Sequence, residues 1–99
     1  MTRTRDKIMR MLDEKRAVIQ SFGVRQLALF GSYASGEPDE ASDLDFVVVF
    51  ERKSFDAYMD LKLFLEDLFG CPVDLVLADA IKPRLRPTIL REMIHAPGL

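Results

Sequence analysis

The sequence lacks several features that would direct it to particular functional classes. Only one of its 99 residues is a cysteine, Cys71, which excludes an intramolecular disulfide and is typical of a protein from a reducing compartment. No apolar run approaches the ~20 residues that a membrane-spanning helix needs. The first residues, MTRTRDKIMRML, contain no uninterrupted apolar segment of the kind found in signal peptides. We therefore expect a cytoplasmic protein that does not associate with membranes.

A net positive charge is also missing. The formal net charge is −2 at pH 7, whereas nucleic-acid-binding domains are usually basic, so direct nucleic-acid binding is not expected. One segment departs from this balance, with a single acid, Glu92, among five basic or titratable side chains: Lys82, Arg84, Arg86, Arg91 and His95. This basic segment is a candidate contact surface. His95, as a lone histidine, is expected to be exposed rather than a general base.

Length and apolar patterning predict one domain over residues 1–99. A chain of this length buries a modest core, and 48% hydrophobic residues is ordinary for a globular protein. The patterns predict, in order, a helix over 4–22, strands over 24–30 and 44–50, a helix over 54–69, a strand over 73–77 and a helix over 87–95. This α-β-β-α-β-α order predicts an α/β (α+β) fold, a small mixed β-sheet with helices packed mainly on one side.

Apolar residues at helical spacing predict the buried faces of the three helices. In the first helix, Lys15 is the one polar interruption of a stripe formed by Ile8, Met11, Leu12, Val18, Ile19 and Phe22. The second helix presents Phe55, Tyr58, Met59, Leu61, Leu65, Leu68 and Phe69, and the third presents Ile89, Leu90, Met93 and Ile94. Thr4 and Ser54 are expected to cap the starts of the first two helices, and Gly23 and Gly70 to follow their ends.

The stretch from Gly31 to Phe50 holds the residues with the clearest chemical meaning. Asp43 and Asp45 flank the start of an apolar strand, and because side chains alternate along a strand they share one face, with Cα atoms roughly 6.5 Å apart. Two neighbouring carboxylates repel each other unless a cation, a proton or solvent relieves them. Carboxylate oxygens are the ligands that Mg²⁺ prefers, often together with substrate phosphates.

The other end of this stretch suggests an anion site. Gly31 and Ser32 directly follow the apolar run 24–30, and glycine allows a tight turn and a close approach to a ligand. If a short helix starts at Ser32, its free N–H groups favour a bound phosphate. A phosphate site beside a metal-ligand pair predicts a phosphorylated, metal-bound substrate such as a nucleoside triphosphate.

These residues fit the pattern G-S-x-A-x-G-x(5)-S-D-x-D, which is read from Gly31, Ser32, Ala34, Gly36, Ser42, Asp43 and Asp45. The pattern resembles the signature of the DNA-polymerase-β-like nucleotidyltransferase superfamily. The short chain resembles its minimal nucleotidyltransferases, which often serve as antitoxins of HEPN toxins (higher eukaryote and prokaryote nucleotide-binding). The resemblance covers about residues 24 to 78. One departure is Ser35, where many members carry a basic residue.

The resemblance implies a set of site residues. Asp43, Asp45 and Asp74 would be the catalytic carboxylates and would hold two Mg²⁺ ions, and Gly31, Ser32 and Ser42 would bind the nucleotide. Asp74 matches the third family carboxylate, and its place inside the apolar run 73–77 calls for a reason because an unpaired buried carboxylate is costly. A structural pairing with an arginine is the alternative explanation for Asp74. Asp79 is the competing third carboxylate, although helix capping suits its position better.

The resemblance also implies an activity and a partner. The chain would move AMP from ATP, or a nucleoside monophosphate from another NTP, onto a hydroxyl of a HEPN-type toxin encoded by a neighbouring gene, and would form a hetero-oligomer with it. The chain is too short for a separate acceptor-binding domain, which argues against an aminoglycoside-type, small-molecule nucleotidyltransferase. A further alternative, favoured by Ser35, is an antitoxin that acts by direct binding with little catalysis.

Overall fold

Four strands form one mixed sheet in the computed structural model, which describes residues 4–31 and 44–99. The elements in chain order are α1 (Arg5–Glu14), α2 (Arg16–Ser21), β1 (Val24–Phe30), β2 (Leu44–Phe50), α4 (Phe55–Phe69), β3 (Val73–Leu77), the short 3₁₀ helix η1 (Ala78–Ala80), α5 (Arg86–Glu92) and β4 (Ile94–His95). The first three strands have the bounds that the sequence predicts.

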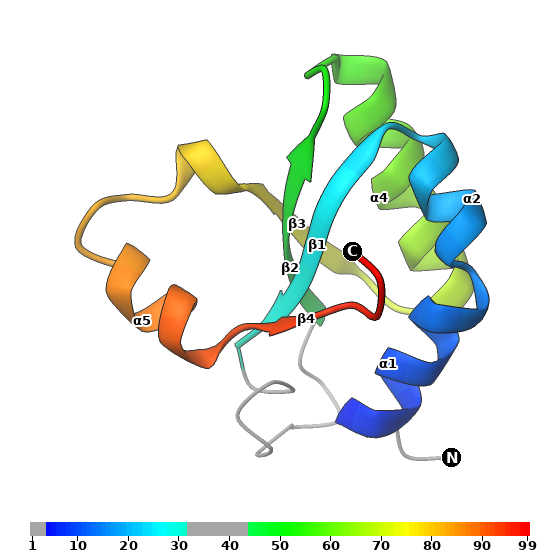
Figure 1. Cartoon of the computed structure of the whole chain (residues 1–99), viewed down its shortest axis with the longest axis horizontal. Coiled ribbons are helices and arrows are strands. Elements are labelled where there is room, and N and C mark those ends of the chain that lie inside the picture. Colours follow the sequence, from blue (N-terminus) through cyan, green and yellow to red (C-terminus); the bar gives the residue numbers. More distant parts are fainter. Residues whose placement is uncertain (1–3, 32–43) are drawn as a thin grey trace.

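The strand order in the sheet is β3-β2-β1-β4 (Figure 1). β1 is antiparallel to both β2 and β4, whereas β2 and β3 run parallel. Parallel neighbours need a long crossover connection, and α4 supplies it. No helix within residues 4–31 and 44–99 has the length and apolar character needed to cross a membrane.

Local sequence signals explain where the helices begin and end. The Lys7 N–H donates to Thr4 Oγ1 at 3.2 Å, and the Ala57 N–H donates to Ser54 Oγ at 3.0 Å, so both predicted N-caps are confirmed. Gly70 ends α4 in the left-handed conformation, with φ +67°. The single helix predicted over 4–22 is wrong in one respect, because the backbone leaves helical geometry at Lys15 and divides it into α1 and α2.

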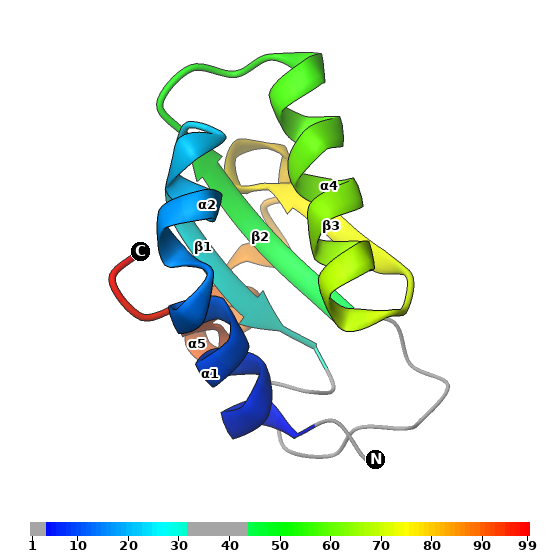
Figure 2. The same cartoon turned by 90° about the vertical axis from the view of Figure 1, so that its right-hand side faces the viewer.

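The main core lies between one face of the sheet and α1, α2 and α4 (Figures 1 and 2). Its fully buried helical side chains include Ile8, Leu12, Ile19, Leu61 and Leu65. Three predicted core positions are wrong, and one of them is Leu90 of α5, which is 53% exposed. Phe55 is 77% exposed because it begins α4, beyond the part of the helix that packs on the sheet, and Val18 is 41% exposed.

The opposite face of the sheet carries a smaller cluster beneath α5. Ala28, Val47 and Ile81 are buried there, with Ile89 and Met93 of the C-terminal region packed against them. The helix predicted to reach His95 ends earlier, at Glu92, because Met93 adopts an extended backbone. Ile94 and His95 then form β4, and the Ala96 N–H donates to the Leu27 carbonyl oxygen at 2.8 Å. Backbone pairing with β1 therefore replaces the last helical turn.

Candidate active site

Asp45 and Asp74 lie side by side on neighbouring parallel strands. They are direct register partners of β2 and β3, and adjacent strands are about 4.8 Å apart. The residues that flank Asp45, Leu44 and Phe46, belong to the main core. Asp45 therefore points to the opposite face, as does Asp74 between Val73 and Leu75. Asp45 is half-buried and Asp74 is exposed, so the burial cost that the sequence suggested for Asp74 does not arise.

Gly31 contacts the Asp45 side chain from the end of β1. Phe30 is the register partner of Asp45, and Gly31 follows it with φ +80°. A Cβ on Gly31 would overlap Oδ2 of Asp45 and would lie 3.1 Å from its Cγ. Glycine is thus required here both by the left-handed backbone and by the space that the carboxylate occupies.

Asp79, the competing third carboxylate, lies elsewhere. It sits inside η1, past the far end of β3, and forms an ion pair with Lys53. It does not cap the helix: Leu77 holds the N-cap position of η1. Of the two candidates for a third carboxylate, only Asp74 lies beside Asp45 on the neighbouring strand. Its role as a metal ligand stays a prediction.

The remaining predicted site residues, Ser32, Ser42 and Asp43, lie outside the described residues, and so does Ser35. Within the described ranges no three His, Cys, Asp or Glu side chains gather as a metal-binding group. Asp45 and Asp74 nevertheless form a pair of adjacent carboxylates on one face of the sheet, and this pair is the carboxylate row. Carboxylate oxygens are the hard donors that suit Mg²⁺. The residues present therefore fit a divalent metal.

Two hydrogen bonds from α4 fix the position of β3 and hence of Asp74. Glu66 Oε2 accepts from the Val73 N–H at 3.0 Å and from Lys62 Nζ at 2.9 Å. The Val73 hydrogen bond, assisted by Lys62, holds the pKa of the Glu66 carboxyl below its ordinary value of 4.5. Tyr58 Oη donates to the Leu75 carbonyl oxygen at 2.6 Å. Both residues that flank Asp74 are thus hydrogen-bonded to side chains of α4.

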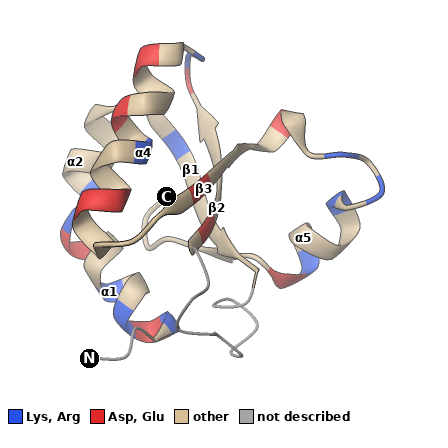
Figure 3. Ribbon diagram, turned by 180° about the vertical axis from the view of Figure 1, so that it is seen from behind, with Lys and Arg blue, Asp and Glu red and all other residues tan. Residues whose placement is uncertain are grey.

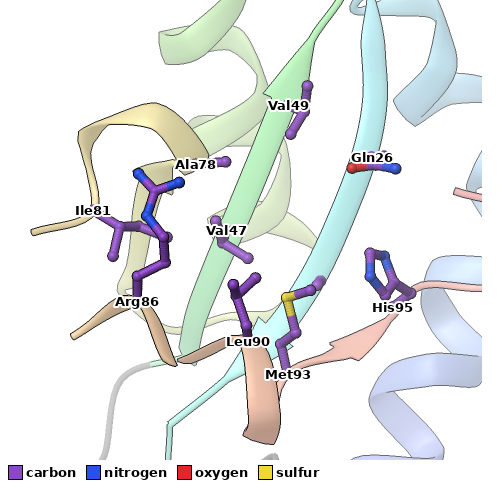
Figure 4. A pocket seen from close by; sticks show the side chains of 10 residues that line it. Gln26, Val47, Val49, Ala78, Ile81, Arg86, Leu90, Met93 and His95 are labelled. Atoms are coloured by element: carbon purple, nitrogen blue, oxygen red, sulfur yellow. The ribbon is translucent and has the colours of Figure 1, made fainter. Parts of the chain in front are cut away.

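A hollow opens on the same sheet face, beside the carboxylate row. It has about 450 Å³ of empty space, including its open mouth. Figure 4 shows the side chains that line it, which come from β1, β2, η1, α5 and β4 and from the residues directly after η1 and α5: Gln26, Ala28, Val47, Val49, Ala78, Ile81, Arg86, Leu90, Met93 and His95. His95 is exposed, as predicted.

Sequence reasoning did not find this hollow, because its wall residues are far apart in the chain. The one available signal was the run Val47-Val48-Val49, since consecutive apolar residues indicate a strand covered on both faces.

Charge is also uneven around the site. Figure 3 shows acidic positions on β2 and β3 and basic positions on the arm that leads into α5.

Comparison with known proteins identifies the family. The model of the nucleotidyltransferase domain matches residues 12–95 of this chain. The chain belongs to the nucleotidyltransferase domain family. The resemblance inferred from the Gly-Ser and Asp-x-Asp pattern is therefore confirmed, and with it the expectation of an enzyme family that generally depends on a metal ion.

Within this nucleotidyltransferase family, the chain is similar to protein adenylyltransferases. The protein adenylyltransferase MntA of Thermococcus cleftensis is 40% identical over 82 residues, which cover 82% of this chain and 83% of the relative. A Methanocaldococcus jannaschii protein, provisionally assigned as a protein adenylyltransferase, is 37% identical over 83 residues, which cover 82% and 85% of the two chains.

Solved structures agree with this placement. A structure assigned as a minimal nucleotidyltransferase shares 40% sequence identity and a TM-score of 0.71, covering 87% of this chain and 93% of that one. This match confirms the predicted α+β nucleotidyltransferase fold. The structure of a tri-AMPylated Shewanella oneidensis HEPN toxin in complex with its MNT antitoxin contains a chain that matches with a TM-score of 0.64 at 19% identity, covering 92% and 73% of the two chains. This second likeness is one of fold.

Proposed function

We propose that this nucleotidyltransferase transfers AMP from ATP onto a hydroxyl of a partner protein, a HEPN-type toxin encoded by a neighbouring gene, and thereby neutralises it. One observation carries the proposal: the Asp45–Asp74 row beside Gly31 lies in a chain that is 40% identical to the MntA adenylyltransferase. The AMPylated toxin in the related Shewanella oneidensis complex supports the choice of acceptor.

In this proposal all three carboxylates bind metal, and one of them also accepts a proton. Asp45, with Asp43 and Asp74, holds the divalent metal, and two Mg²⁺ ions would neutralise charge on the triphosphate. The Gly31 backbone and Ser32 cradle the β- and γ-phosphates, with Ser42 as a further nucleotide contact. Asp74, which is exposed beside Asp45, accepts the proton of the incoming hydroxyl and releases it to water.

The reaction is one displacement at the α-phosphorus. The acceptor oxygen forms a bond to the α-phosphorus, and the bond from that phosphorus to the oxygen bridging the α- and β-phosphates breaks. Pyrophosphate leaves with the electron pair. The products are the AMP ester of the acceptor, pyrophosphate and the proton that the hydroxyl has lost. Attacking and leaving oxygens are roughly in line at phosphorus.

Intact-protein mass spectrometry tests this function. The neighbouring-gene product is incubated with the nucleotidyltransferase, Mg²⁺ and each of the four NTPs in turn. We expect a mass gain of one or more AMP units with ATP. The gain should disappear with the Asp43→Asn/Asp45→Asn protein and persist with Asp67→Asn, which changes an exposed carboxylate on α4. A stable, inhibitory complex without any mass gain would instead assign an antitoxin that acts by binding alone.

A further inference from the structure

Residues 82–91 form a basic arm that the proposed chemistry does not use. The arm leaves the sheet after Ile81, which is buried in the smaller cluster, and returns to that cluster at Ile89. Every side chain of the arm except Ile89 is exposed. Figure 1 shows the chain between η1 and α5 bowing away from the sheet. Because the exposed side chains contribute nothing to either core, packing does not account for their identity.

The arm is held in one conformation although it buries little surface. The Leu85 N–H donates to the Lys82 carbonyl oxygen at 2.9 Å, and the Arg86 N–H donates to the same oxygen at 3.2 Å. Pro83 and Pro87 restrict the backbone further because the proline ring fixes φ, and Pro87 lies in the first turn of α5, where no hydrogen-bond donor is needed. A surface that is ordered before binding loses little conformational entropy when a partner binds.

The arm concentrates positive charge on the side of the sheet that carries α5. It contains Lys82, Arg84, Arg86 and Arg91 and no aspartate or glutamate. Within the described ranges, none of these four side chains forms an ion pair. Figure 3 shows basic positions along the arm and acidic positions on β2 and β3. Four cations that no carboxylate of the described chain neutralises favour a partner of negative charge.

Apolar side chains among the cations favour a protein partner over a nucleic acid. Leu85 and Leu90 both stand exposed between the basic residues, and protein interfaces typically combine arginine with an apolar centre. Single strands of nucleic acid are bound through aromatic side chains that stack on bases, and the arm contains none. The arm therefore fits a protein surface that is acidic around an apolar centre.

We propose that the basic arm docks an acidic surface of the acceptor protein and holds that protein beside the carboxylate row; the identity of the partner as the acceptor rests on the proposed function. Ile81 and Ile89 attach the two ends of the arm to the cluster that contains Val47. Val47 follows Asp45 by two residues, roughly 7 Å, along β2. A protein bound to the arm thus lies next to the sheet face to which Asp45 and Asp74 point.

The arm contributes binding rather than chemistry. Its cations contact the acceptor protein away from the reacting hydroxyl, so they bind the ground state and the transition state equally well. Loss of such an interaction raises KM and leaves kcat unchanged. Lys82 and Arg84 are therefore docking residues, and their removal is expected to raise KM for the acceptor protein alone.

Isothermal titration calorimetry without nucleotide tests the docking surface apart from turnover. The probe is the neighbouring-gene product, titrated into the nucleotidyltransferase at low and at physiological salt. We expect the Lys82→Glu/Arg84→Glu protein to bind about tenfold more weakly than the wild type at low salt, and the gap to narrow as salt screens the charges. Arg10→Glu/Arg52→Glu, an equal charge reversal at exposed positions outside the arm, should bind within about twofold of the wild type.

The outcomes separate this inference from the proposed function. A complex that depends on the arm, with no mass gain after Mg²⁺-ATP is added, would contradict the transfer activity and leave the docking surface in place. Equal affinities of the two charge-reversed proteins, or no binding by the wild type, would overturn the docking surface whether or not AMP is transferred.

Two further measurements on the Lys82→Glu/Arg84→Glu protein exclude other ligands of the arm. Its affinity for Mg²⁺-ATP should equal that of the wild type, and a loss would assign the arm to nucleotide binding. A single-stranded RNA oligonucleotide is the second probe. Tighter binding of this RNA than of the acceptor protein, abolished by the same charge reversal, would make the arm a nucleic-acid surface. Either result would overturn the inference.

Discussion

At the scale of single residues, the proposed mechanism requires charge that only a carboxylate supplies. Asp45→Asn and Asp74→Asn keep the shape of each side chain but remove its charge, so we expect AMP transfer to fall about 10²-fold or more. The measurement is the initial rate of AMP incorporation into the acceptor protein. Asp67→Asn is the matched control on an exposed helix face. Rates within twofold of the wild type for both variants would remove these residues from the mechanism.

Two of the left-handed glycines, Gly31 and Gly70, allow backbone strain to be separated from site geometry. An alanine in this conformation costs about 1–2 kcal/mol, and both positions have positive φ. Only at Gly31 would the new Cβ meet the Asp45 carboxylate, since nothing lies within 4 Å of the equivalent atom at Gly70.

We therefore expect Gly31→Ala to lower both stability and AMP transfer, and Gly70→Ala to lower stability alone. Chemical denaturation followed by circular dichroism measures the first effect, and the transfer rate measures the second. Full activity of the Gly31→Ala protein would show that the position of Asp45 does not depend on this contact.

At the scale of secondary-structure elements, Glu66 couples α4 to the first residue of β3. The pKa of Glu66 is held below its ordinary value of 4.5 by the Val73 N–H and by Lys62. A lowered pKa in the folded state means that the ionised group stabilises the protein above about pH 4.5. This contribution is lost as the pH falls through the folded-state pKa.

Glu66→Gln should accordingly lower the denaturation midpoint at neutral pH, and its difference from the wild type should shrink in acid, at about pH 3.5. Urea denaturation at the two pH values provides the measurement. Asp67→Asn, on the neighbouring exposed position, should show no such convergence. A difference that stays constant with pH would assign the Glu66 effect to packing rather than to its charge.

Elements with a strong local pattern were predictable from the sequence. The strands β1, β2 and β3 have the predicted bounds, and the caps at Thr4, Ser54 and Gly70 act as expected. The break at Lys15 was not predicted, because helical spacing continues through it. β4 was missed for another reason: two residues cannot show the alternation that identifies a strand, and pairing with β1 decides their conformation.

The candidate site, too, could be predicted only where its residues are close together in the sequence. The Gly-Ser pair and the acidic pair stand out within one short stretch of sequence, and the family comparison supports that interpretation. The pairing of Asp45 with Asp74 instead depends on the parallel register of β2 and β3, which a sequence pattern does not fix. The hollow depends on five elements that meet only in the folded chain.

At the scale of the whole molecule, β4 covers an edge of the sheet. It pairs with Ala28 and Leu29 of β1, and Ala96 is buried behind it. An uncovered strand edge is a template for intermolecular pairing. We expect a protein truncated after Met93 to be less stable and to self-associate, as measured by light scattering across a concentration series.

Two point variants complete this test. Ala96→Asp, which places a charge at a buried position, should reproduce the loss of stability in the full-length protein. His95→Gln, which changes an exposed side chain and leaves the backbone pairing intact, should remain monodisperse. A truncated protein that is as stable and as monodisperse as the full chain would show that the β1 edge needs no cover.

The pairing of β1 with β4 attaches the C-terminal segment to the sheet through two residue pairs, Ala28 with His95 and Leu29 with Ile94. Proteins open locally, and short terminal elements open most easily. The pairing of Asp45 with Asp74 needs no residue beyond β3, whereas Met93 and His95 form part of the wall of the hollow. Opening of the C-terminal segment is thus expected to remove that wall while the carboxylate row stays in place.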